Sequence, residues 1–510
     1  MASTAADLEE HTQPVDVEKN AQQSTTHSSA SSTTVGKEEN VDVAATPAPV
    51  AAPLDWDGPN DPDNPWNWPM SKRWYGTVVP GCLCLLVTFT SSVYAAGVYE
   101  VSAEFDVSIT TALLGVSMYV IGLGLGPMFS APLSEVFGRK MVYFVNLPIF
   151  MLFTMGAGLA HNIETLCLCR AFAGIFGGPA LAVSAGSFVD VWDLKTSGSA
   201  VTVQAFATFM GPSVGPVVGG YLVDAKGWRW TMWIVLMMAG ALLVPLYILE
   251  ESYKPVILKR RALARGQELP PKPDPKTALK MIFTITLARP TVMLVKEPIV
   301  QAVALYSSFA FAVLFGFFEA YPFVFQREYQ MSLGETGLCF LGIALGLCLG
   351  CLLYLVQDRI FYVPAHKKHN GSPPAEIRLI PAMIGSGLMP VGLFWFAWTA
   401  KKEIPWIVPC LAGIPFGAGL VLVFLSAIMY ILEVYTPLVA ASAIAGLGLL
   451  RYIFAMASPL FTVKMFENLG IAWATSVFGF IAIGLMPIPW IFNKWGPQIR
   501  RMSKFDALKD

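Results

Sequence analysis

Residues 211–220 read Gly-Pro-Ser-Val-Gly-Pro-Val-Val-Gly-Gly, inside an apolar stretch long enough to cross a lipid bilayer. On a helix, residues four positions apart lie on one face, and here a smooth stripe is formed by Gly211, Gly215 and Gly219. Pro212 and Pro216 form a second stripe, and each removes a backbone hydrogen-bond donor. Neighbouring membrane helices can satisfy the carbonyls that such prolines leave free, whereas a soluble helix would break. The segment therefore predicts a closely packed, bendable membrane helix.

The composition of the whole chain also indicates a membrane protein. Of the 510 residues, 55% are hydrophobic and 14% are charged, and the mean hydropathy is +0.56. A soluble protein of this length could not bury so much apolar surface. The net charge of −1 argues against a nucleic-acid binder that depends on bulk electrostatics.

Several kinds of chemistry lack support in the sequence. No loop of the Gly-x4-Gly-Lys-Ser/Thr type occurs, which argues against ATP hydrolysis by that route. The eight cysteines lie in or beside apolar stretches without a cluster of His or carboxylates, so we expect packing residues rather than metal ligands or disulfides. No nucleophile and base occur at a recognisable spacing. We therefore expect neither an enzyme nor a metal or cofactor.

Hydropathy predicts twelve spans in two groups of six, at about 20 residues per crossing. Residues 1–53 are rich in Ser, Thr, Ala and acids and predict a disordered tail. A juxtamembrane segment at 54–73, a first six-helix bundle at 74–249, a basic central loop at 250–298, a second bundle at 299–492 and a tail at 493–510 follow. The spans are expected near 75–97, 112–132, 141–160, 165–188, 200–222, 230–249, 299–325, 336–356, 379–398, 406–430, 438–461 and 471–492.

The distribution of cations predicts that both ends of the chain lie in the cytoplasm. With that topology the inner segments after residue 53 carry 24 Lys and Arg residues and the outer loops carry six. This asymmetry follows the positive-inside rule for an even number of crossings. The sequon at Asn370 then faces the cytoplasm and carries no glycan. Two six-span halves predict a substrate site between them, near the middle of the membrane.

Three motifs resemble signatures of the major facilitator superfamily. Residues 131–140 (Ala-Pro-Leu-Ser-Glu-Val-Phe-Gly-Arg-Lys) are similar to its cytoplasmic signature Gly-x-Leu-x-Asp-x-x-Gly-Arg-Arg/Lys. Residues 170–178 (Arg-Ala-Phe-Ala-Gly-Ile-Phe-Gly-Gly) resemble its Arg-x-x-x-Gly-x-x-Gly motif, which is associated with proton coupling. The segment ending at Gly220 resembles the signature of drug:proton antiporters. Ala131 and Glu135 replace the usual Gly and Asp.

Further motifs resemble the fungal drug:proton antiporters with twelve spans. They are Asp-Pro-Asp-Asn-Pro-Trp-Asn-Trp at 61–68, Gly-Trp-Arg-Trp at 227–230, Glu-Ser-Tyr-Lys-Pro at 251–255 and Val-Tyr-Thr-Pro-Leu-Val-Ala-Ala-Ser-Ala at 434–443. The resemblance extends from residue 55 to 501. That group includes polyamine exporters, azole and cycloheximide resistance pumps, and toxin exporters of secondary-metabolite clusters. In the second half only Asp358-Arg359 echoes the cytoplasmic signature, which leaves symmetric ion pairs in doubt.

The resemblance implies a fold, a function and a gate. The implied fold is the all-α superfamily fold of two six-helix bundles, which works as a monomer. The implied function is export of small hydrophobic or cationic compounds across the plasma or vacuolar membrane in exchange for protons, with the proton gradient as the energy source. The implied gate latches the cytoplasmic ends together through Glu135, Gly138, Arg139 and Lys140. Glu433, at the inner end of the tenth span, is expected to be a gate or topology residue.

Four charged residues are expected in the spans, Glu433 among them, and each needs a partner or a purpose. The resemblance assigns Arg170 to proton coupling; the alternative is a structural cation bonded to carbonyls. Glu319 is the candidate proton carrier, because aromatic neighbours disfavour its charged form. It could instead partner a fixed arginine or face water at the outer interface. Arg451 could pair with Glu319, face an anionic substrate or be structural.

Aromatic side chains supply a candidate cavity lining. By analogy with the family, Phe315, Phe318 and Tyr321 in the seventh span would stack on a flat hydrophobic or cationic substrate. Most other rings are expected to face lipid. Two other functions stay open: a proton-coupled importer or facilitator of a small metabolite, and a membrane sensor that no longer transports. The sequence does not identify the substrate.

Overall fold

The computed structural model describes residues 55–192, 197–267, 284, 288–369, 373–503 and 505. Within these ranges the regular elements are helices, as the hydropathy predicts. Lipid offers no hydrogen-bond partners, so a spanning segment satisfies its backbone internally by forming a helix. The tail predicted at 1–53, Asn370 of the sequon and part of the central loop lie outside the described residues.

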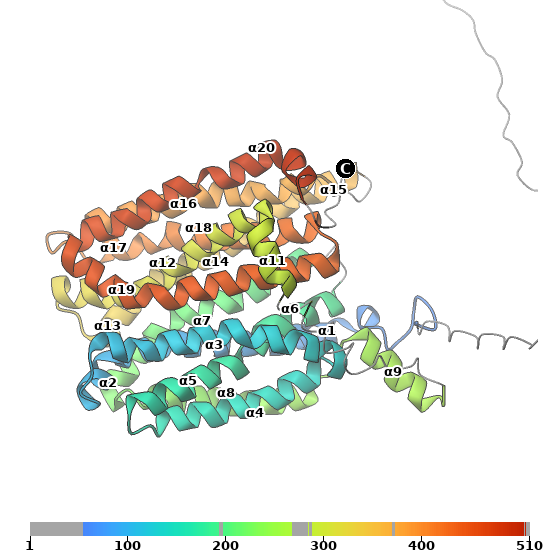
Figure 1. Ribbon diagram of the computed structural model, residues 1–510, viewed down its shortest axis with the longest axis horizontal. Coiled ribbons are helices and arrows are strands. Elements are labelled where there is room, and N and C mark those ends of the chain that lie inside the picture. Colours follow the sequence, from blue (N-terminus) through green and yellow to red (C-terminus); the bar gives the residue numbers. More distant parts are fainter. Residues whose placement is uncertain are drawn as a thin grey trace, which may run out of the picture. The chain divides into compact units, whose positions relative to one another are not determined.

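The first half of the molecule is the blue-to-green group of helices in Figure 1. Its helices are α1 (Met70–Val93), α2 (Val98–Glu104), α3 (Ile109–Phe137), α4 (Arg139–Gly158), α5 (Ile163–Gly177), α6 (Pro179–Val191), α7 (Ser197–Lys226) and α8 (Trp230–Ile248). The pairs α1–α2 and α5–α6 each form one apolar run. The helix α7 continues through both prolines that the sequence placed in it.

The second half is the yellow-to-red group in Figure 1. Its helices are α11 (Arg289–Lys296), α12 (Pro298–Tyr329), α13 (Leu333–Leu338), α14 (Leu341–Gln357), α15 (Val363–Lys368), α16 (Ile380–Thr399), α17 (Ile407–Leu411), α18 (Gly413–Val434), α19 (Pro437–Leu485) and α20 (Pro487–Arg501). A short helix, α9 (Lys254–Ala264), lies between the halves in sequence. The central loop therefore contains helices at both of its ends.

Eleven helical runs of the described residues are long and apolar enough to cross a membrane, against the twelve predicted. The last run, Val439–Arg501, has 63 residues, about three times what one crossing needs. Inside it Gly470 has φ of 75° and ψ of 163°, which is not helical. Figure 1 shows α19 turning sharply within its length. The turn lies between the two spans predicted near 438–461 and 471–492, and the count of twelve stays a prediction.

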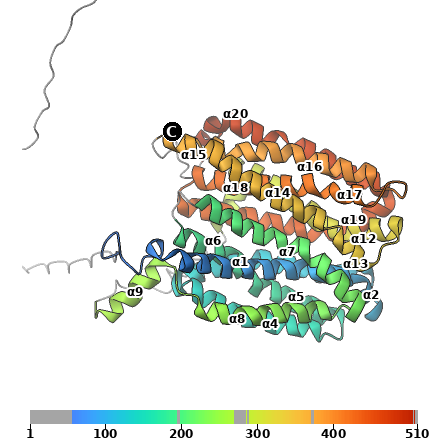
Figure 2. The ribbon, with the colours of Figure 1, turned by 180° about the vertical axis from the view of Figure 1, so that it is seen from behind.

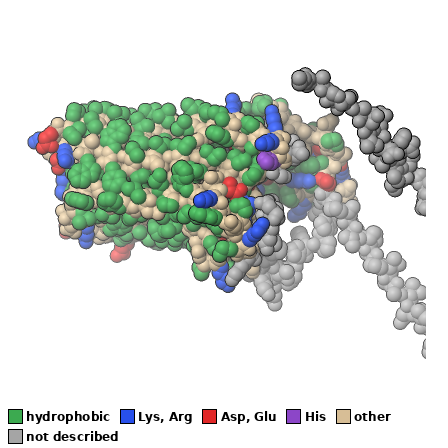
Figure 3. Space-filling view, turned by 90° about the horizontal axis from the view of Figure 1, so that it is seen from above, with side chains coloured by type: hydrophobic (Ala, Val, Ile, Leu, Met, Phe, Trp, Pro, Cys, Tyr) green, Lys and Arg blue, Asp and Glu red, His purple; other side chains and the backbone are tan. Residues whose placement is uncertain are grey.

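The surface carries the pattern expected of a membrane protein. Figure 3 shows hydrophobic side chains covering the visible face, while charged side chains gather towards its two ends. Exposed apolar residues occur along most spanning helices, for example Leu152 on α4, Val244 on α8 and Phe480 on α19. Exposed apolar surface of this extent marks contact with lipid rather than water.

The glycine stripe of the antiporter motif packs against α1. A Cβ added at Gly211 would overlap the Thr88 hydroxyl, and one added at Gly215 would overlap the Ser92 hydroxyl. A Cβ at Gly219 would press on the carbonyl of Val93. Only glycine allows the two backbones to approach this closely. The predicted close packing of this helix is confirmed, and its partner is α1.

The opposite face of α7 packs against the second half. Figures 1 and 2 show α7 beside α1 and α14, and α7 also contacts α13. A Cβ added at Gly337 on α13 would overlap the carbonyl of Pro216, and the backbone N–H of Gly334 donates to Asp224 at 2.9 Å. The halves meet a second time where α3 contacts α19, and Ser117 donates to the carbonyl of Met456 at 2.8 Å.

The juxtamembrane segment is bound to α9 by a cluster of ion pairs that we call the acidic clasp. Its members are Asp55, Asp57, Asp61, Asp63, Lys254, Arg261 and Arg265. Arg261 donates to both oxygens of Asp61, at 2.6 and 2.8 Å. This guanidinium lowers the pKa of Asp61 well below its usual value, and the carboxylates raise the pKa of Arg261. The clasp joins the segment before α1 to the helix after α8.

Candidate functional site

The gate motif of the first half is built around Arg139, the first residue of α4. Its Nε forms an ion pair with Asp190, near the end of α6, at 3.0 Å. Its Nη1 donates to the Ser134 hydroxyl at 2.6 Å, and its guanidinium lies 4.6 Å from the ring centre of Tyr253. The cation therefore joins the ends of α3, α4 and α6.

Glu251 caps the same helix end. The backbone N–H groups of Arg139 and Lys140 donate to its two carboxylate oxygens, at 2.8 and 3.2 Å. A carboxylate at a helix N-terminus satisfies otherwise unpaired donors and interacts favourably with the helix dipole. Gly138 before the helix has φ of 94°, and its Cα lies against the Glu251 carboxylate. Lys140 Nζ donates to the carbonyl of Tyr247 at 2.8 Å, which ties α4 to the end of α8.

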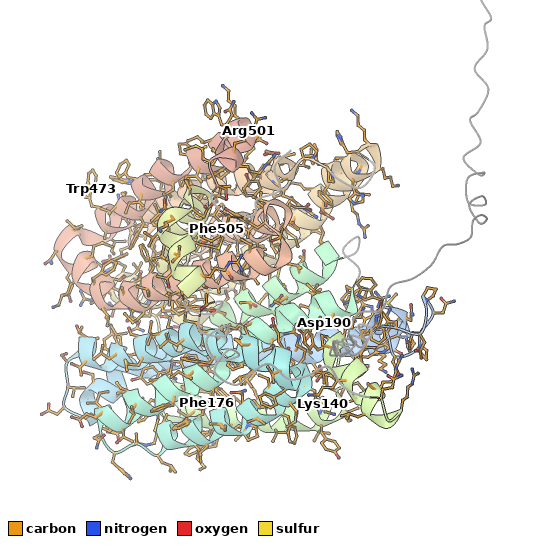
Figure 4. All side chains as sticks on the ribbon, turned by 45° about the vertical axis from the view of Figure 1, so that its right-hand side comes forward. Lys140, Phe176, Asp190, Trp473, Arg501 and Phe505 are labelled. Carbon is orange, nitrogen blue, oxygen red and sulfur yellow. The ribbon has the colours of Figure 1, made fainter. Side chains whose placement is uncertain are left out.

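Glu135, the acid of the gate motif, lies apart from the contacts around Arg139. Its side chain is exposed at the end of α3, whereas the ion pair of Arg139 is made with Asp190. The latch that the family resemblance implies is not formed by Glu135 in this conformation. Figure 4 labels Lys140 and Asp190 at the end of the bundle where α9 lies, which we call the gate end.

The second half carries a corresponding network around Arg378, just before α16. Arg378 Nη1 forms an ion pair with Asp358 at 2.6 Å, and Nη2 forms one with Glu433 at 3.3 Å. The Tyr362 hydroxyl donates to Glu433 at 2.6 Å, and the guanidinium lies 3.2 Å from the ring centre of Tyr362. Glu433 is thus one of two acids that hold a buried arginine. A second pair, Arg500 and Glu376, joins α20 to the same region.

Sequence reasoning missed Asp190, Glu251 and Arg378 as gate residues. For Asp190 and Arg378, the signal in the sequence was their position within the spans. Arg139 begins the third span and Asp190 ends the fourth; Arg378 and Glu433 hold the equivalent places in the ninth and tenth. An alignment of the two halves, span by span, would have matched Arg139 with Arg378 and Asp190 with Glu433. A search for the cytoplasmic loop motif found only Asp358-Arg359. The ion pairs of Arg139 and Arg378 each lie within one half.

Arg170 is buried in the first half, 1% exposed, at the meeting of α1, α3 and α5. Its Nε donates to the carbonyl of Gly115 at 2.7 Å, and Nη2 donates to that of Thr90 at 3.2 Å. The rings of Tyr94 and Tyr119 lie 4.5 and 4.8 Å from the guanidinium. Carbonyls and ring faces therefore hold this cation, the arrangement foreseen as its structural alternative.

Glu319 lies on α12 and is 3% exposed. Its Oε1 has no hydrogen-bond partner among the described residues. Gly316 and Phe323 lie on the same face of α12, three and four residues away, and contact Ser458 and Phe466 of α19. Burial without a partner strongly disfavours a carboxylate and favours its neutral, protonated form.

Glu319 also lies close to the first half. Tyr94 and Tyr99 of the first half lie within electrostatic range of its carboxyl, and Tyr94 is the tyrosine whose ring faces Arg170. The acid is therefore near the boundary between the halves. Arg170 and Glu319 thus both lie near one tyrosine, Tyr94.

Arg451 lies on α19 among aromatic rings. Its guanidinium is 4.6 Å from the ring centre of Phe311, 5.0 Å from Phe424 and 5.1 Å from Tyr452. Phe209 of α7 contacts the first two rings, at 5.3 and 4.8 Å. We call Phe209, Phe311, Phe424 and Tyr452 the junction cluster, because its members come from both halves.

The rings expected to line the cavity occupy another place. Phe318 and Tyr321 pack against Phe340, at 5.9 and 4.6 Å between ring centres, and Tyr321 stacks on Phe396. Phe315 contacts Phe318, and all three are nearly inaccessible. These rings form the core of the second half, while a ring one turn earlier on α12, Phe311, reaches the junction between the halves.

Comparison with known proteins supports one family over most of the chain. The model of the Major Facilitator Superfamily matches residues 81–459. The chain is 42% identical over 482 residues to Saccharomyces cerevisiae polyamine transporter 4, covering 89% of this chain and 73% of that protein. It is 39% identical over 462 residues to the citrinin biosynthesis cluster MFS transporter mrr1 of Monascus ruber, covering 89% and 92%.

A further relative and a solved structure are similar to this chain as well. The multidrug transporter mdrA of Aspergillus fumigatus is 41% identical over 459 residues, covering 88% of this chain and 75% of that protein. The structure of the proton:xylose symporter XylE superposes with a TM-score of 0.62 at 17% identity, covering 84% and 97%, which supports the fold alone. A family match over most of the chain, relatives well above 30% identity and two six-helix halves agree: the chain belongs to the Major Facilitator Superfamily and is a membrane transporter, not an enzyme.

Proposed function

We propose that this transporter exports small hydrophobic organic compounds in exchange for protons by alternating access. The relatives include proteins named for toxin clusters and for multidrug transport, which supports export. We also propose that the gate end faces the cytoplasm, with both termini, and that the protein resides in the plasma membrane. The predicted excess of basic residues at that end supports this orientation.

The observation that carries the proton exchange is Glu319. Its carboxyl is buried, its Oε1 lacks a partner, and it lies near the boundary between the halves. A neutral carboxylic acid is stable in such a place, whereas a carboxylate needs water or a cation. Rocking of the halves would change the access of this group to water and thus its protonation. One proton moving down the membrane potential supplies about 2.3 kcal/mol per 100 mV.

The contacts between the halves support a conformation closed at the end opposite the gate. The hydrogen bonds from Ser117 to Met456 and from Gly334 to Asp224 link the halves in that part of the molecule. At the gate end the networks of Arg139 and Arg378 stay within their own halves. We infer that the structure represents an inward-facing or occluded state, and that Arg139 exchanges partners when the gate end closes.

The experiment first identifies a cargo and then tests coupling. A panel of azoles, cycloheximide and polyamines in pump-deleted yeast that expresses the chain identifies a compound to which it confers resistance. Uptake of that compound into inside-out proteoliposomes is then measured with an imposed pH gradient, acidic inside. We expect uphill uptake that Glu319→Gln reduces at least tenfold, because an amide cannot release a proton.

Glu403→Gln, at an exposed carboxylate outside the spans, is the matched control and should transport normally. Downhill exchange without a gradient should survive in Glu319→Gln, which separates loss of coupling from loss of folding. Uphill transport that is independent of the pH gradient, or unchanged in Glu319→Gln, would contradict the proposal. Accumulation in the opposite direction would make the protein an importer.

A further inference from the structure

We propose that the junction cluster around Arg451 is the cargo site and that it selects a planar organic anion, such as an aromatic carboxylate. This inference rests on the proposed transport function and narrows its cargo. The guanidinium of Arg451 faces three of the rings, and the fourth, Phe209, joins them from the other half. The site thus combines one positive charge with flat apolar surfaces.

The first argument is the missing countercharge. Among the described residues Arg451 Nε has no hydrogen-bond partner and no ion pair of Arg451 is found. The polar group beside Arg451 is the hydroxyl of Tyr452, which carries no charge at neutral pH. Ring faces stabilise a cation by about 0.5–2 kcal/mol, far less than the loss of water costs it. An anion from outside the protein would supply the missing charge.

The other buried arginines show how this chain neutralises such a cation. Arg139 has Asp190, Arg378 has two acids, and Arg500 has Glu376. Arg170 has two backbone carbonyls. Arg451 differs from all four, because neither an acid nor a carbonyl is found as its partner among the described residues. Its side chain is partly accessible, so a partner from outside the protein can reach it.

The second argument is the origin of the rings. Phe209 belongs to α7, Phe311 to α12, Phe424 to α18 and Tyr452 to α19. The Cβ of Tyr452 also lies against Gly124 of α3. A flat molecule bound here would contact both halves at once, so rocking of the halves would make and break its contacts. The rings already contact one another, at 4.8–6.5 Å between centres, so a planar cargo would replace some of these ring contacts with its own.

The third argument is the sign of the charge. A cationic compound among these rings would meet Arg451 at close range and without screening water, which disfavours it. A carboxylate can instead accept two parallel hydrogen bonds from a guanidinium. We therefore expect the site to prefer anions over neutral compounds and neutral compounds over cations.

The experiment measures binding without any gradient, so it does not depend on proton coupling. Three probes share one ring system and differ in charge: 1-naphthoate, 1-naphthamide and 1-naphthylmethylammonium. Their affinity for the purified full-length protein in detergent is measured by isothermal titration. We expect 1-naphthoate to bind at least tenfold more tightly than the cation. Arg451→Gln should weaken 1-naphthoate at least tenfold, leave 1-naphthamide within twofold and improve binding of the cation.

Two further variants separate charge from folding and from ring stacking. Arg451→Lys keeps the charge and should retain part of the preference for the anion, whereas Arg327→Gln, at an exposed arginine, should match the wild type. Phe424→Leu should weaken all three probes about equally. The proposal is overturned if the wild type does not bind 1-naphthoate, or if Arg451→Gln binds it as well as the wild type does. Binding with the expected charge preference but without proton-driven transport would refute only the proposed function.

Discussion

The gate ends of the two halves each hold one arginine at equivalent places, but the arginines have different acidic partners. Arg139 pairs with Asp190 and leaves Glu135 exposed at the end of α3. Arg378 pairs with both acids available to it, Asp358 from the eighth span and Glu433 from the tenth. The second network is therefore complete within its own half, whereas the first has an acid in reserve. This difference indicates that the first half is the one that changes partners during transport.

The largest effect is expected at Gly138. Alanine there would be strained at φ of 94°, and its Cβ would overlap the carboxylate of Glu251 that caps α4. Gly496 in the second half has a similar contact, because a Cβ there would overlap the carboxylate of Glu376, but it lies within the helix α20. We expect Gly138→Ala to abolish transport and lower the yield of folded protein severalfold, with a smaller loss for Gly496→Ala.

Size-exclusion profiles and thermal unfolding of the two purified variants provide the measurement. Gly448→Ala is a suitable control, since nothing lies within 4 Å of an added Cβ at that position. Equal behaviour of Gly138→Ala and Gly496→Ala would show that the positive φ contributes little.

The next effect compares the two arginines directly. The side chain of Arg378 is 6% exposed and has two acidic partners, and that of Arg139 is 14% exposed and has one. Removal of a buried cation leaves its acids unpaired, at a cost of about 3–5 kcal/mol for a fully buried pair and less where the acids reach water, as here. We expect Arg378→Gln to lower the unfolding temperature more than Arg139→Gln does. The reverse order would contradict the view that the second network is the more complete.

A third effect separates transport from stability. Glu135→Gln should leave thermal unfolding unchanged, within about 0.5 kcal/mol, because the side chain is exposed in this conformation. The same variant should lower the transport rate severalfold if Glu135 becomes a partner in the other conformation. Asp358→Asn changes the residue at the equivalent place in the second half. It should lower both the thermal stability and the transport rate, because Asp358 already forms an ion pair with Arg378. Wild-type transport in Glu135→Gln would exclude the exchange of partners.

The smallest effect concerns the acidic clasp, which has no described equivalent in the second half. Arg261 lowers the pKa of Asp61, so the ion pair stabilises the folded state above the usual carboxyl pKa. That stability is lost only as the pH falls through the lowered value. We expect the rate of trypsin cleavage after Arg261 to stay low between pH 8 and pH 6.5, and Asp61→Asn to raise it severalfold. A strong rise in the wild type on mild acidification would contradict this assignment.

Local sequence patterns predicted the features that depend on neighbours along the chain. The glycine stripe of α7 predicted close packing whatever the partner helix, and the apolar runs predicted the spans. The turn at Gly470 is a single residue inside a long apolar run, and it falls between the two spans predicted near 438–461 and 471–492. These predictions depended on periodicity and length, which the sequence displays directly.

Features that depend on which helices meet have no signal in any local stretch of the sequence. Arg378 and Glu433 are 55 residues apart, and nothing in either neighbourhood indicates the other. Phe311 and Phe315 are one turn apart on α12, and only the packing of α7 decides which of them reaches the junction. Arg170 had two interpretations, a role in proton coupling or a structural cation bonded to carbonyls, and only the fold shows which groups surround it.

The acidic clasp has a consequence for biosynthesis. Its aspartates precede the first span and its arginines follow the sixth, so the ribosome makes Arg261 only after the whole first half. The pairing of Arg261 with Asp61 can therefore form before the second bundle is inserted. The nascent first half would then be fastened at its gate end in the order of its synthesis, and the later spans would be added to a unit that is already assembled.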